Sequence, residues 1–364
     1  MRIVLTGGGT GGHIYPAIAI GRQLQHDASA ELLYIGTHRG LEARIVPEAG
    51  IAFEAIDITG FKRRLSLDNV KTVLRFLRGV RRAKALLRRF KPDAVVGTGG
   101  YVCGPVVYAA SKLGIPTLIH EQNVDPGLTN RFLSRYADRI AVSFAESAPH
   151  FDSRKLVHTG NPCATEVLRA DRAAGYASLG IAPGRPIVLV VGGSRGARAF
   201  NEALPGMLGQ LDRLPAELVF VTGEAYYEHT KGRLAANAAP ANLHVVPYVH
   251  NMPQVLAAAT LVVCRAGASS LAELTALGVP SILIPSPNVT NNHQEPNARA
   301  LADAGAAEMM LERELTGEAL IGRIAAIVGD PQRLRRMGDA ARALGMPEAG
   351  AQLSRELQAL CAGR

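Results

Sequence analysis

Cysteine and aromatic residues are scarce in this sequence of 364 residues, and their scarcity narrows the classes of protein to consider. The four cysteines are scattered, without a CxxC pair and without a histidine cluster at metal-ligand spacing. This pattern excludes a disulfide framework and gives no support for a structural zinc site, so the cysteines are interpreted as small core residues. Nine Phe, nine Tyr and no Trp leave few rings for stacking on nucleic-acid bases.

Long apolar runs are absent as well. Gly, Pro or a charged residue interrupts each apolar stretch within about a dozen positions, whereas a helix that crosses a bilayer needs about 20 residues. The N-terminus reaches Gly7 after six residues, which leaves no apolar segment for a secretory signal. A hydrophobic content of 48% excludes a disordered protein, and 364 residues are enough for two domains of ordinary size. We expect a two-domain protein that stays in the cytosol.

Positive charge is present but confined to one segment. The whole chain carries +9, yet residues 62–91 hold twelve basic residues and one acid, a local +11 that leaves −2 elsewhere. Apolar residues recur in this segment every three or four positions, which predicts an amphipathic helix that begins near Asp68 and ends before Pro92. Its predicted apolar face consists of Val73, Phe76, Val80, Leu87 and Phe90, widened by Val70, Leu74 and Leu77.

This basic helix is predicted to bind a membrane surface. Each Lys or Arg near an anionic leaflet contributes on the order of 1 kcal/mol, so half of the cluster is enough to hold a peripheral protein there. The residues assigned to this membrane patch are Lys71, Arg75, Phe76, Arg78 and Arg82. A solvated basic face that also serves the core is an open alternative. A nucleic-acid surface is less favoured, because no nucleic-acid-binding motif is present.

Short apolar runs alternate with helical patterns, which predicts an α/β protein. The expected strands are residues 3–5, 32–35, 94–96, 117–119, 187–191, 218–221, 261–263 and 281–284. These runs are apolar without alternation, as in parallel strands that are buried on both faces. A strand followed by a glycine loop occurs twice, at residues 2–9 and again at 186–194. We therefore predict two doubly wound domains with a boundary near residue 161, and two final helices over 332–344 and 348–360.

The first glycine loop, Gly7-Gly8-Gly9-Thr10-Gly11-Gly12, satisfies GxGxxG. A dinucleotide site also needs an acid at the end of the next strand, and residues 34–37 supply none. We favour a loop whose backbone amides and following helix N-terminus approach an anionic or sugar ligand. A simple tight turn is the alternative.

Further polar segments follow other strands of this half. A second glycine loop covers residues 97–105, and His120-Glu121-Gln122-Asn123 stands directly at a strand end. Because ligands bind at the carboxyl edge of open α/β sheets, these segments are candidate site residues. A buried capping network is the alternative interpretation of residues 120–123.

The second half repeats the arrangement. Gly192-Gly193-Ser194 with Arg195 and Arg198 opens a helix where a diphosphate would be stabilised. Ser270 and Glu273 fit S-x-x-E, so Glu273 is either part of a capping box or a carboxylate that accepts hydrogen bonds from the ribose hydroxyls of a nucleotide. The polar segment 285–294 is either a reader of sugar hydroxyls or an ordinary helix start.

The ordered set of these motifs resembles the MurG family of peptidoglycan N-acetylglucosaminyltransferases. No single motif is specific, but together they run in order across nearly the whole chain. The matching segments are 8–13, 97–105, 120–123 with 129–130, 160–162, 192–197, 264–273 and 293–298. The resemblance implies two Rossmann-like doubly wound parallel-sheet domains facing a cleft, the GT-B fold. It also implies three segments: an acceptor and membrane domain over 1–161, a UDP-sugar domain over 162–340, and a C-terminal helix over 341–364 that packs back on the first domain.

The resemblance further implies the reaction and its partners. N-acetylglucosamine would move from UDP-N-acetylglucosamine to lipid I, the muramoyl-pentapeptide on undecaprenyl diphosphate, giving lipid II. The expected location is the cytoplasmic face of the bacterial inner membrane, on anionic lipids and near other cell-wall synthesis proteins. No metal is expected, since D-x-D is absent from the sequence. No cofactor and no nucleic-acid partner are expected either. The alternative is another UDP-sugar enzyme of this fold, such as a glycolipid glycosyltransferase or a UDP-N-acetylglucosamine epimerase.

Site residues follow from the resemblance position by position. Ser194 would contact the diphosphate, the backbone of Val249 the uracil, and Glu273 the ribose. The turn Ala268-Ser269-Ser270-Leu271-Ala272, with Gln294, would reach the sugar, while Thr10, Gly11, Gly12 and Asn123 would close over donor and acceptor. The family often has an arginine where this chain has Cys163-Ala164, so Arg195 or Arg198 is expected to compensate.

Inversion at the sugar requires a base for the acceptor hydroxyl. His13 is the first candidate because imidazole titrates near working pH, and Glu121 is the second. His13 could instead only orient the substrate.

Overall fold

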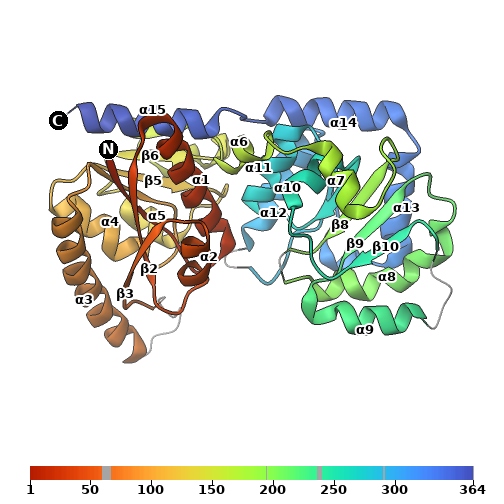
Figure 1. Ribbon diagram of the computed structural model, residues 1–364, viewed down its shortest axis with the longest axis horizontal. Coiled ribbons are helices and arrows are strands. Elements are labelled where there is room, and N and C mark those ends of the chain that lie inside the picture. The colour runs from red at the N-terminus through yellow and green to blue at the C-terminus, as the bar shows by residue number, and fades with distance from the viewer. Residues whose placement is uncertain (60–66, 194, 236–239, 290–291, 364) are drawn as a thin grey trace. The chain divides into compact units, whose positions relative to one another are not determined.

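The computed structural model describes the chain except residues 60–66, 194, 236–239, 290–291 and 364 (Figure 1). The chain divides into two compact units: Met1–Cys163 with Glu348–Arg364, and Ala164–Pro347. The division falls at the start of the short helix α6 (Cys163–Val167). Residues 341–347, expected in the returning C-terminal segment, belong instead to the second unit.

The first unit is built on a seven-stranded sheet in the order β3-β2-β1-β4-β5-β6-β7, and all neighbours are parallel. The strands are β1 (Arg2–Thr6), β2 (Glu31–Thr37), β3 (Ala52–Ile56), β4 (Ala94–Gly97), β5 (Thr117–Glu121), β6 (Arg139–Val142) and β7 (Leu156–His158). The helices are α1 (Gly11–Ala28), α2 (Glu42–Glu48), α3 (Leu67–Phe90), α4 (Cys103–Lys112), α5 (Leu128–Leu133), the 3-10 helix η1 (Ala145–His150) and α15 (Ala349–Ala362). The predicted doubly wound parallel sheet is confirmed.

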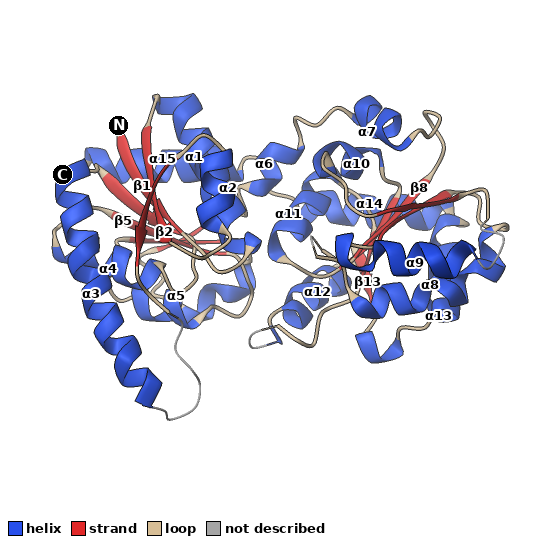
Figure 2. Ribbon diagram, turned by 60° about the horizontal axis from the view of Figure 1, so that its bottom comes forward, coloured by secondary structure: helices blue, strands red, loops and turns tan. Residues whose placement is uncertain are grey.

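Two apolar clusters fill the two faces of this sheet. One contains Leu24 of α1 together with Leu353 and Leu357 of α15, so the C-terminal helix is part of the first unit's core. The other contains Val80 and Leu87 of α3 and the buried face of α4. Helices therefore cover both faces, as Figure 2 shows for the strands drawn in red. This double burial explains why the central strands are continuously apolar.

The second unit repeats the plan with six parallel strands in the order β10-β9-β8-β11-β12-β13. The strands are β8 (Ile187–Val191), β9 (Glu217–Val221), β10 (Leu243–Val246), β11 (Leu261–Cys264), β12 (Ser281–Leu283) and β13 (Ala307–Met309). The helices are α7 (Arg172–Leu179), α8 (Arg198–Leu211), α9 (Glu224–Ala235), α10 (Met252–Ala258), α11 (Ala268–Leu277), α12 (Gln294–Asp303), η3 (Glu312–Glu314), α13 (Gly317–Val328) and α14 (Pro331–Leu344). Helices α14 and α15 confirm the two helices expected at the C-terminus.

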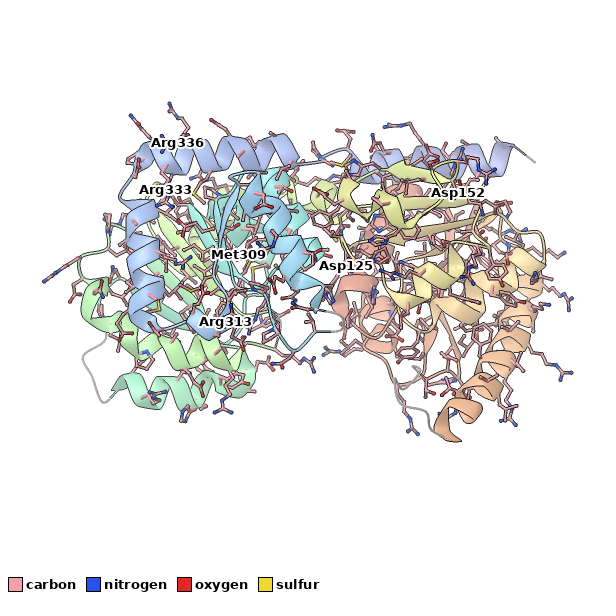
Figure 3. All side chains as sticks on the ribbon, turned by 180° about the vertical axis from the view of Figure 1, so that it is seen from behind. Asp125, Asp152, Met309, Arg313, Arg333 and Arg336 are labelled. Atoms are coloured by element: carbon pink, nitrogen blue, oxygen red, sulfur yellow. The ribbon has the colours of Figure 1, made fainter. Side chains whose placement is uncertain are left out.

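Arginines cover the short edge strand β13. Arg323 donates to the Met309 carbonyl over 3.1 Å, and Arg333 of α14 forms an ion pair with Glu308. Figure 3 labels Met309, Arg333 and Arg336 in this region. An edge strand whose polar groups are engaged in this way is a poor template for pairing with another chain.

The strand order of each sheet reverses at one position. In the first sheet β1 lies between β2 and β4, and in the second β8 lies between β9 and β11. Ligands of open α/β sheets bind at the carboxyl ends of the strands beside such a switch point. The loops after β1, β4, β8 and β11 are therefore the places to look for a site.

Candidate functional site

The two glycine loops of the first unit touch each other at its switch point. The amide of Gly8 donates to the Gly99 carbonyl over 3.2 Å. Thr98, at the end of β4, donates its hydroxyl to the His13 carbonyl over 2.7 Å. The loops after β1 and β4 thus form one structure at the carboxyl edge of the sheet, as predicted.

His13 is held within this structure by its ring. Its Nδ1 lies 3.0 Å from the Gly8 carbonyl oxygen and 3.2 Å from the Thr10 hydroxyl. A carbonyl can only accept, so Nδ1 carries the hydrogen and the neutral ring has its lone pair on Nε2. The ring packs against Gly99, where a β-carbon would come 2.8 Å from His13 Cδ2. The side chain is half-buried, which suits a group that must meet a substrate.

Thr10, Gly11 and Gly12 form the start of α1. Thr10 is the N-cap residue, but its side chain makes no capping hydrogen bond and contacts His13 instead. Thr10 and Gly12 are exposed, and Gly11 is half-buried. Since the first amides of a helix lack partners within the helix, this N-terminus keeps donors for a ligand.

The glycine loop itself is a less open donor surface than we predicted. Gly8 uses its amide on Gly99, and the Gly9 amide donates to the carboxylate of Glu42 over 3.3 Å. Tyr34 donates its hydroxyl to the Gly7 carbonyl over 2.8 Å. Protein groups thus engage the amides of Gly8 and Gly9, and the donors that remain for a ligand are those at the start of α1.

Residues 120 and 122 form the buried network that was the alternative interpretation. The fully buried His120 lies with Nε2 2.9 Å from the Gly160 carbonyl, and its Nδ1 lies 3.0 Å from the Gln122 amide nitrogen. Burial lowers the pKa of His120. The hydrogen bond to Gly160 and the charge of Glu121 raise it, but by less. His120 is a neutral structural residue that ties β5 to the segment after β7.

Glu121 organises the loop after β5. Its carboxylate accepts from the backbone and side-chain amides of Asn123 over 3.0 and 3.2 Å. It also accepts from the Gly127 amide over 3.1 Å and from Asn130 over 2.8 Å. Both oxygens are engaged and the side chain is 2% exposed, so Glu121 holds Asn123 and the rest of this loop in place.

In the second unit, the loop after β8 lies against the loop after β9. Gly196 has φ +73°, and a β-carbon there would come 2.0 Å from the Thr222 carbonyl oxygen. The adjacent Ser194, assigned to the diphosphate, lies outside the described residues. Arg198 pairs with Glu202 of its own helix over 2.7 Å, whereas Arg195 is exposed and forms no ion pair with any other described residue. Of the two arginines expected to compensate for Cys163-Ala164, Arg195 is thus the better placed.

The turn after β11 corrects the capping-box interpretation. Gly267 is the N-cap residue of α11, so Ser270 stands inside the first turn and Glu273 in the second. A capping box needs its serine at the N-cap position, so Ser270 and Glu273 do not form one. Helix α11 has no side-chain cap, which leaves its first amides without a side-chain acceptor.

Glu273 is a poorly solvated carboxyl group on this helix. Burial, reinforced by the negative charge of Glu166, raises the pKa of Glu273 to about 7. Its carboxylate forms no ion pair with the described residues. A partly buried carboxyl group with a raised pKa and without such a partner, beside a switch point, is a functional-site signal.

The remaining assigned residues surround the same sheet edge. Val249 is buried in the segment after β10, so only its backbone is suited to a ligand. Gln294, the first residue of α12, accepts a hydrogen bond from the Ser286 amide over 2.9 Å. Ala268 and Leu271 are buried, whereas Ser269, Ser270 and Ala272 are partly accessible. The buried Asn297 donates to the Ala266 carbonyl over 3.3 Å and joins α12 to the turn after β11.

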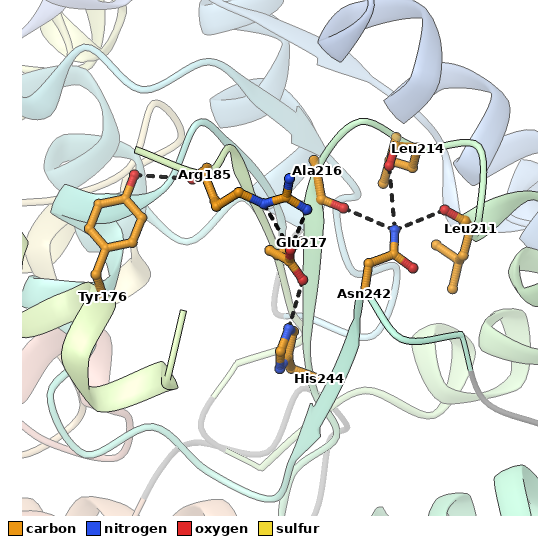
Figure 4. Close-up of polar contacts among 8 residues, drawn as sticks. All are labelled: Tyr176, Arg185, Leu211, Leu214, Ala216, Glu217, Asn242 and His244. Atoms are coloured by element: carbon orange, nitrogen blue, oxygen red, sulfur yellow. Dashed lines mark hydrogen bonds and ion pairs between the residues drawn. The ribbon is translucent and has the colours of Figure 1, made fainter. Parts of the chain in front are cut away.

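A polar network that the sequence did not reveal lies at the opposite, amino edge of the second sheet (Figure 4). Glu217 accepts two hydrogen bonds from Arg185, over 2.7 and 3.1 Å, and lies 2.9 Å from His244 Nε2. His244 and Arg185 lower the pKa of Glu217. The network joins the starts of β8, β9 and β10, so it stabilises the sheet away from the candidate site.

Only some residues of the predicted membrane patch on α3 are exposed. Phe76 does not face outward: it packs on Tyr108 and Phe132, with ring centroids 6.0 and 6.1 Å apart, and so anchors the helix to the core. Arg75, Arg78 and Arg82 are exposed, although Arg82 also pairs with Glu54 over 3.3 Å. The side chain of Lys71 lies outside the described residues.

Three residues of the predicted apolar face of α3 are exposed instead of buried. Leu74 and Leu77 are 52% and 58% exposed, and Val73 is 46% exposed. The helix ends at Phe90, and Lys91 has φ +53° before Pro92, as predicted. None of the described helices has the length and apolarity needed to cross a bilayer.

Comparison with known proteins defines the class. Residues 3–142 match the glycosyltransferase family 28 N-terminal domain, and residues 187–353 match the glycosyltransferase family 28 C-terminal domain. The fold and the two switch-point sites are thus those of a two-domain glycosyltransferase.

Individual relatives narrow this class. The chain is 57% identical to the UDP-N-acetylglucosamine--N-acetylmuramyl-(pentapeptide) pyrophosphoryl-undecaprenol N-acetylglucosamine transferase of Halalkalibacterium halodurans, over 97% of this chain and 98% of the relative. A transferase of the same name from Bacillus cereus is 54% identical, over 97% of both chains. The crystal structure of Acinetobacter baumannii MurG matches with a TM-score of 0.79 and 33% identity, over 98% of this chain and 99% of that one. The chain belongs to the MurG family of glycosyltransferases.

A more distant structure shares only the fold. The UDP-GlcNAc 2-epimerase from Neisseria meningitidis, solved with bound UDP-GlcNAc, matches with a TM-score of 0.70 at 14% identity, over 99% of this chain and 100% of that one.

Proposed function

We propose that this protein transfers N-acetylglucosamine from UDP-N-acetylglucosamine to N-acetylmuramyl-(pentapeptide) pyrophosphoryl-undecaprenol, that is, from the sugar nucleotide to lipid I with formation of lipid II. The 57% identity over 97% of the chain to a transferase of that name carries the proposal. The same reaction is the one that the ordered motifs imply.

His13 is the proposed general base. Its Nδ1 is held on the Gly8 carbonyl, so Nε2 is the atom that takes the proton of the acceptor hydroxyl. The deprotonated oxygen attacks the anomeric carbon from the side opposite UDP, and one displacement converts the α-linked donor into a β-linked product. Glu121, the other candidate, is less suited to this role because four hydrogen bonds already engage its carboxylate.

Donor binding is assigned to the second unit. Glu273 would accept hydrogen bonds from the ribose hydroxyls, and these donors would replace the water that burial removes from the carboxylate. The N-termini of α8 and α11 would stabilise the diphosphate as negative charge develops on departing UDP, and Arg195 would add a positive charge. Ser194 is assigned to the diphosphate from the sequence motif alone. The Val249 backbone would hold the uracil, and Gln294 would contact the sugar.

We further propose that α3 holds the enzyme at an anionic membrane surface, where a polyprenyl acceptor resides. Exposed Val73, Leu74 and Leu77 supply an apolar surface, and Arg75, Arg78 and Arg81 surround it with positive charge. Each such charge contributes on the order of 1 kcal/mol near an anionic leaflet. The location on the cytoplasmic face of the inner membrane belongs to this proposal.

The experiment is a transfer assay with radiolabelled UDP-N-acetylglucosamine and a short-chain lipid I analogue. The proposal requires label in the lipid fraction only when the analogue is present. Isomerisation of the sugar nucleotide without any acceptor would instead identify an epimerase. A product formed only on another glycolipid would leave the fold and donor intact but overturn the acceptor.

A further inference from the structure

We propose that Glu42 controls His13 through the peptide group that joins Gly8 and Gly9, so that carboxylate, peptide and imidazole form one hydrogen-bonded chain. This inference rests on the proposed role of His13 as the base. It assigns Glu42 as a positioning residue of the transfer reaction, although Glu42 belongs to α2 and stands far from His13 in sequence.

The two hydrogen bonds of the chain share one peptide group. Glu42 Oε2 accepts from the Gly9 amide over 3.3 Å, and the Gly8 carbonyl oxygen lies 3.0 Å from His13 Nδ1. The Gly9 N–H and the Gly8 C=O belong to the same planar, resonance-coupled unit. A negative charge at the N–H end therefore increases the negative charge on the carbonyl oxygen and strengthens its bond to Nδ1–H.

Glu42 is present as a carboxylate in this arrangement. Its side chain is fully buried, yet its Oε1 accepts from the Thr37 amide over 3.2 Å and from the Thr37 hydroxyl over 2.6 Å. Its three partners are thus the Thr37 amide, the Thr37 hydroxyl and the Gly9 amide. Two of the three are backbone N–H groups, which can only donate. A buried carboxylate is costly unless it is hydrogen-bonded in this way, and a neutral side chain would fill the space at less cost.

The loop around His13 is also faced by other titratable groups. They are Tyr34 from β2, and Tyr101 and Cys103 from the segment after β4. Burial raises the pKa of the Cys103 thiol to about 12 and raises that of Tyr34 well above its ordinary value. Both groups are thus neutral at working pH, and Glu42 is the carboxylate that contacts the loop.

This chain has two consequences for the reaction. It keeps the hydrogen of the neutral ring on Nδ1, which leaves Nε2 as the proton acceptor. It also stabilises the imidazolium that forms when Nε2 takes the acceptor's proton, as a directly bonded carboxylate does in Asp-His pairs. The peptide group carries that effect without placing a negative charge beside the sugar diphosphate.

The test is the variant Glu42→Gln, which keeps the side-chain shape and removes the charge. We expect kcat to fall about tenfold while the KM for UDP-N-acetylglucosamine changes less than about twofold, since outer-shell partners typically contribute 10–100-fold. Nitrogen-15 NMR of histidine-labelled, substrate-free full-length protein should show the His13 titration midpoint lower by about 0.5–1 pH unit, because an opposite charge has been removed. Glu42→Asp, which restores the charge, should recover part of that shift.

The matched control is Tyr34→Phe. It removes another buried anchor of the same loop, the bond to the Gly7 carbonyl, without changing charge or touching the Gly8–Gly9 peptide group. The titration midpoint of His13 in Tyr34→Phe should equal that in the wild type. Should Glu42→Gln fail to fold, the wild-type spectrum is itself decisive: the neutral His13 ring must carry its hydrogen on Nδ1, and an Nε2–H ring would overturn the inference.

Different measurements test the role of Glu42 and the role of His13 as the base. An unchanged His13 midpoint in folded Glu42→Gln overturns the chain even if His13 is essential. Normal turnover by His13→Ala overturns the base, whereas the NMR shift does not depend on turnover. In the double variant, Glu42→Gln should cause no further loss of kcat beyond that of His13→Ala, and an additive loss would contradict action through His13.

Discussion

Gly100 lies so close to Gly8 that a β-carbon on Gly100 would come 2.2 Å from the Gly8 carbonyl oxygen. That oxygen is the one that fixes the His13 ring. Gly100 also has φ +81°, a conformation that favours glycine. The contact between the two glycine loops therefore sets the position of the proposed base.

Gly100→Ala should destabilise the first unit and displace the Gly8 carbonyl. The left-handed backbone alone costs about 1–2 kcal/mol for a residue with a β-carbon, and the clash with backbone atoms adds to it, for a total above about 3 kcal/mol. Urea unfolding followed by circular dichroism measures the loss. Gly50→Ala is the matched control in the same unit, because Gly50 has φ +76° but nothing within 4 Å of its β-carbon position. Equal losses in the two variants would contradict the close packing of the loops.

Glu273 should make the stability of the second unit depend on pH. Burial raises the pKa of Glu273 from 4.5 to about 7, so the folded state holds this proton more tightly than the unfolded chain does. The stability that it contributes is full below pH 4.5 and is lost as the pH rises to about 7, an effect on the order of 1–3 kcal/mol. Glu273→Gln should thus raise the thermal midpoint more at pH 8 than at pH 5. The exposed Glu228→Gln on α9 should show no such difference, and a pH-independent effect of Glu273→Gln would contradict the raised pKa.

The same carboxyl group should control nucleotide binding. If the Glu273 carboxylate accepts the ribose hydroxyls, UDP should bind more tightly as the pH rises through about 7 and should release a proton near that pH. Glu273→Gln should weaken UDP binding about 10–100-fold at pH 8 and remove the proton release, since hydrogen bonds to a charged group contribute about 1.5–3 kcal/mol. Isothermal titration in two buffers of different ionisation enthalpy measures both quantities. Unchanged affinity would remove Glu273 from the donor site.

Replacing Leu74 and Leu77 with Gln should weaken binding to anionic vesicles without unfolding the protein. Both side chains are more than half exposed, so they contribute little to the core. Burial of an exposed Leu in a bilayer interface contributes about 1.5–3 kcal/mol, and added salt should weaken the remaining electrostatic attraction. Sedimentation with phosphatidylglycerol vesicles measures the change. Leu168→Gln in the second unit, at 46% exposure, is the control, and an equal loss in that variant would contradict a docking role of α3.

The central strands could be predicted from the sequence because burial on both faces leaves a continuous apolar run. All eight expected strands are present. The additional strands β3, β7, β10 and β13 lie at sheet edges and are only partly buried, so they carry residues such as Glu54 and His244 that mask the apolar signal. The remaining addition, β6, is short and begins with a charged residue. Loss of burial on one side, rather than unusual local chemistry, made these strands hard to recognise.

The glycine loops that follow strands could be predicted from the sequence, but the contacts that their residues make could not. The search for an acid at the end of the second strand found none, whereas Glu42 begins the next helix and reaches Gly9 because β1 and β2 are neighbours. The capping-box interpretation failed because the N-cap residue of α11 is Gly267, three residues before Ser270. Periodicity placed Phe76 on the apolar face of α3, but its inclusion in the membrane patch was wrong because its contacts with Tyr108 and Phe132 depend on tertiary packing.

The most direct test of the account is the turnover of His13→Ala with UDP-N-acetylglucosamine and the short-chain lipid I analogue, measured beside the dissociation constant for UDP. The account predicts a kcat about 10²–10⁴ times lower than that of the wild type, because general-base catalysis is lost, with UDP affinity within about twofold. Near-normal turnover by a variant that still binds UDP would contradict it.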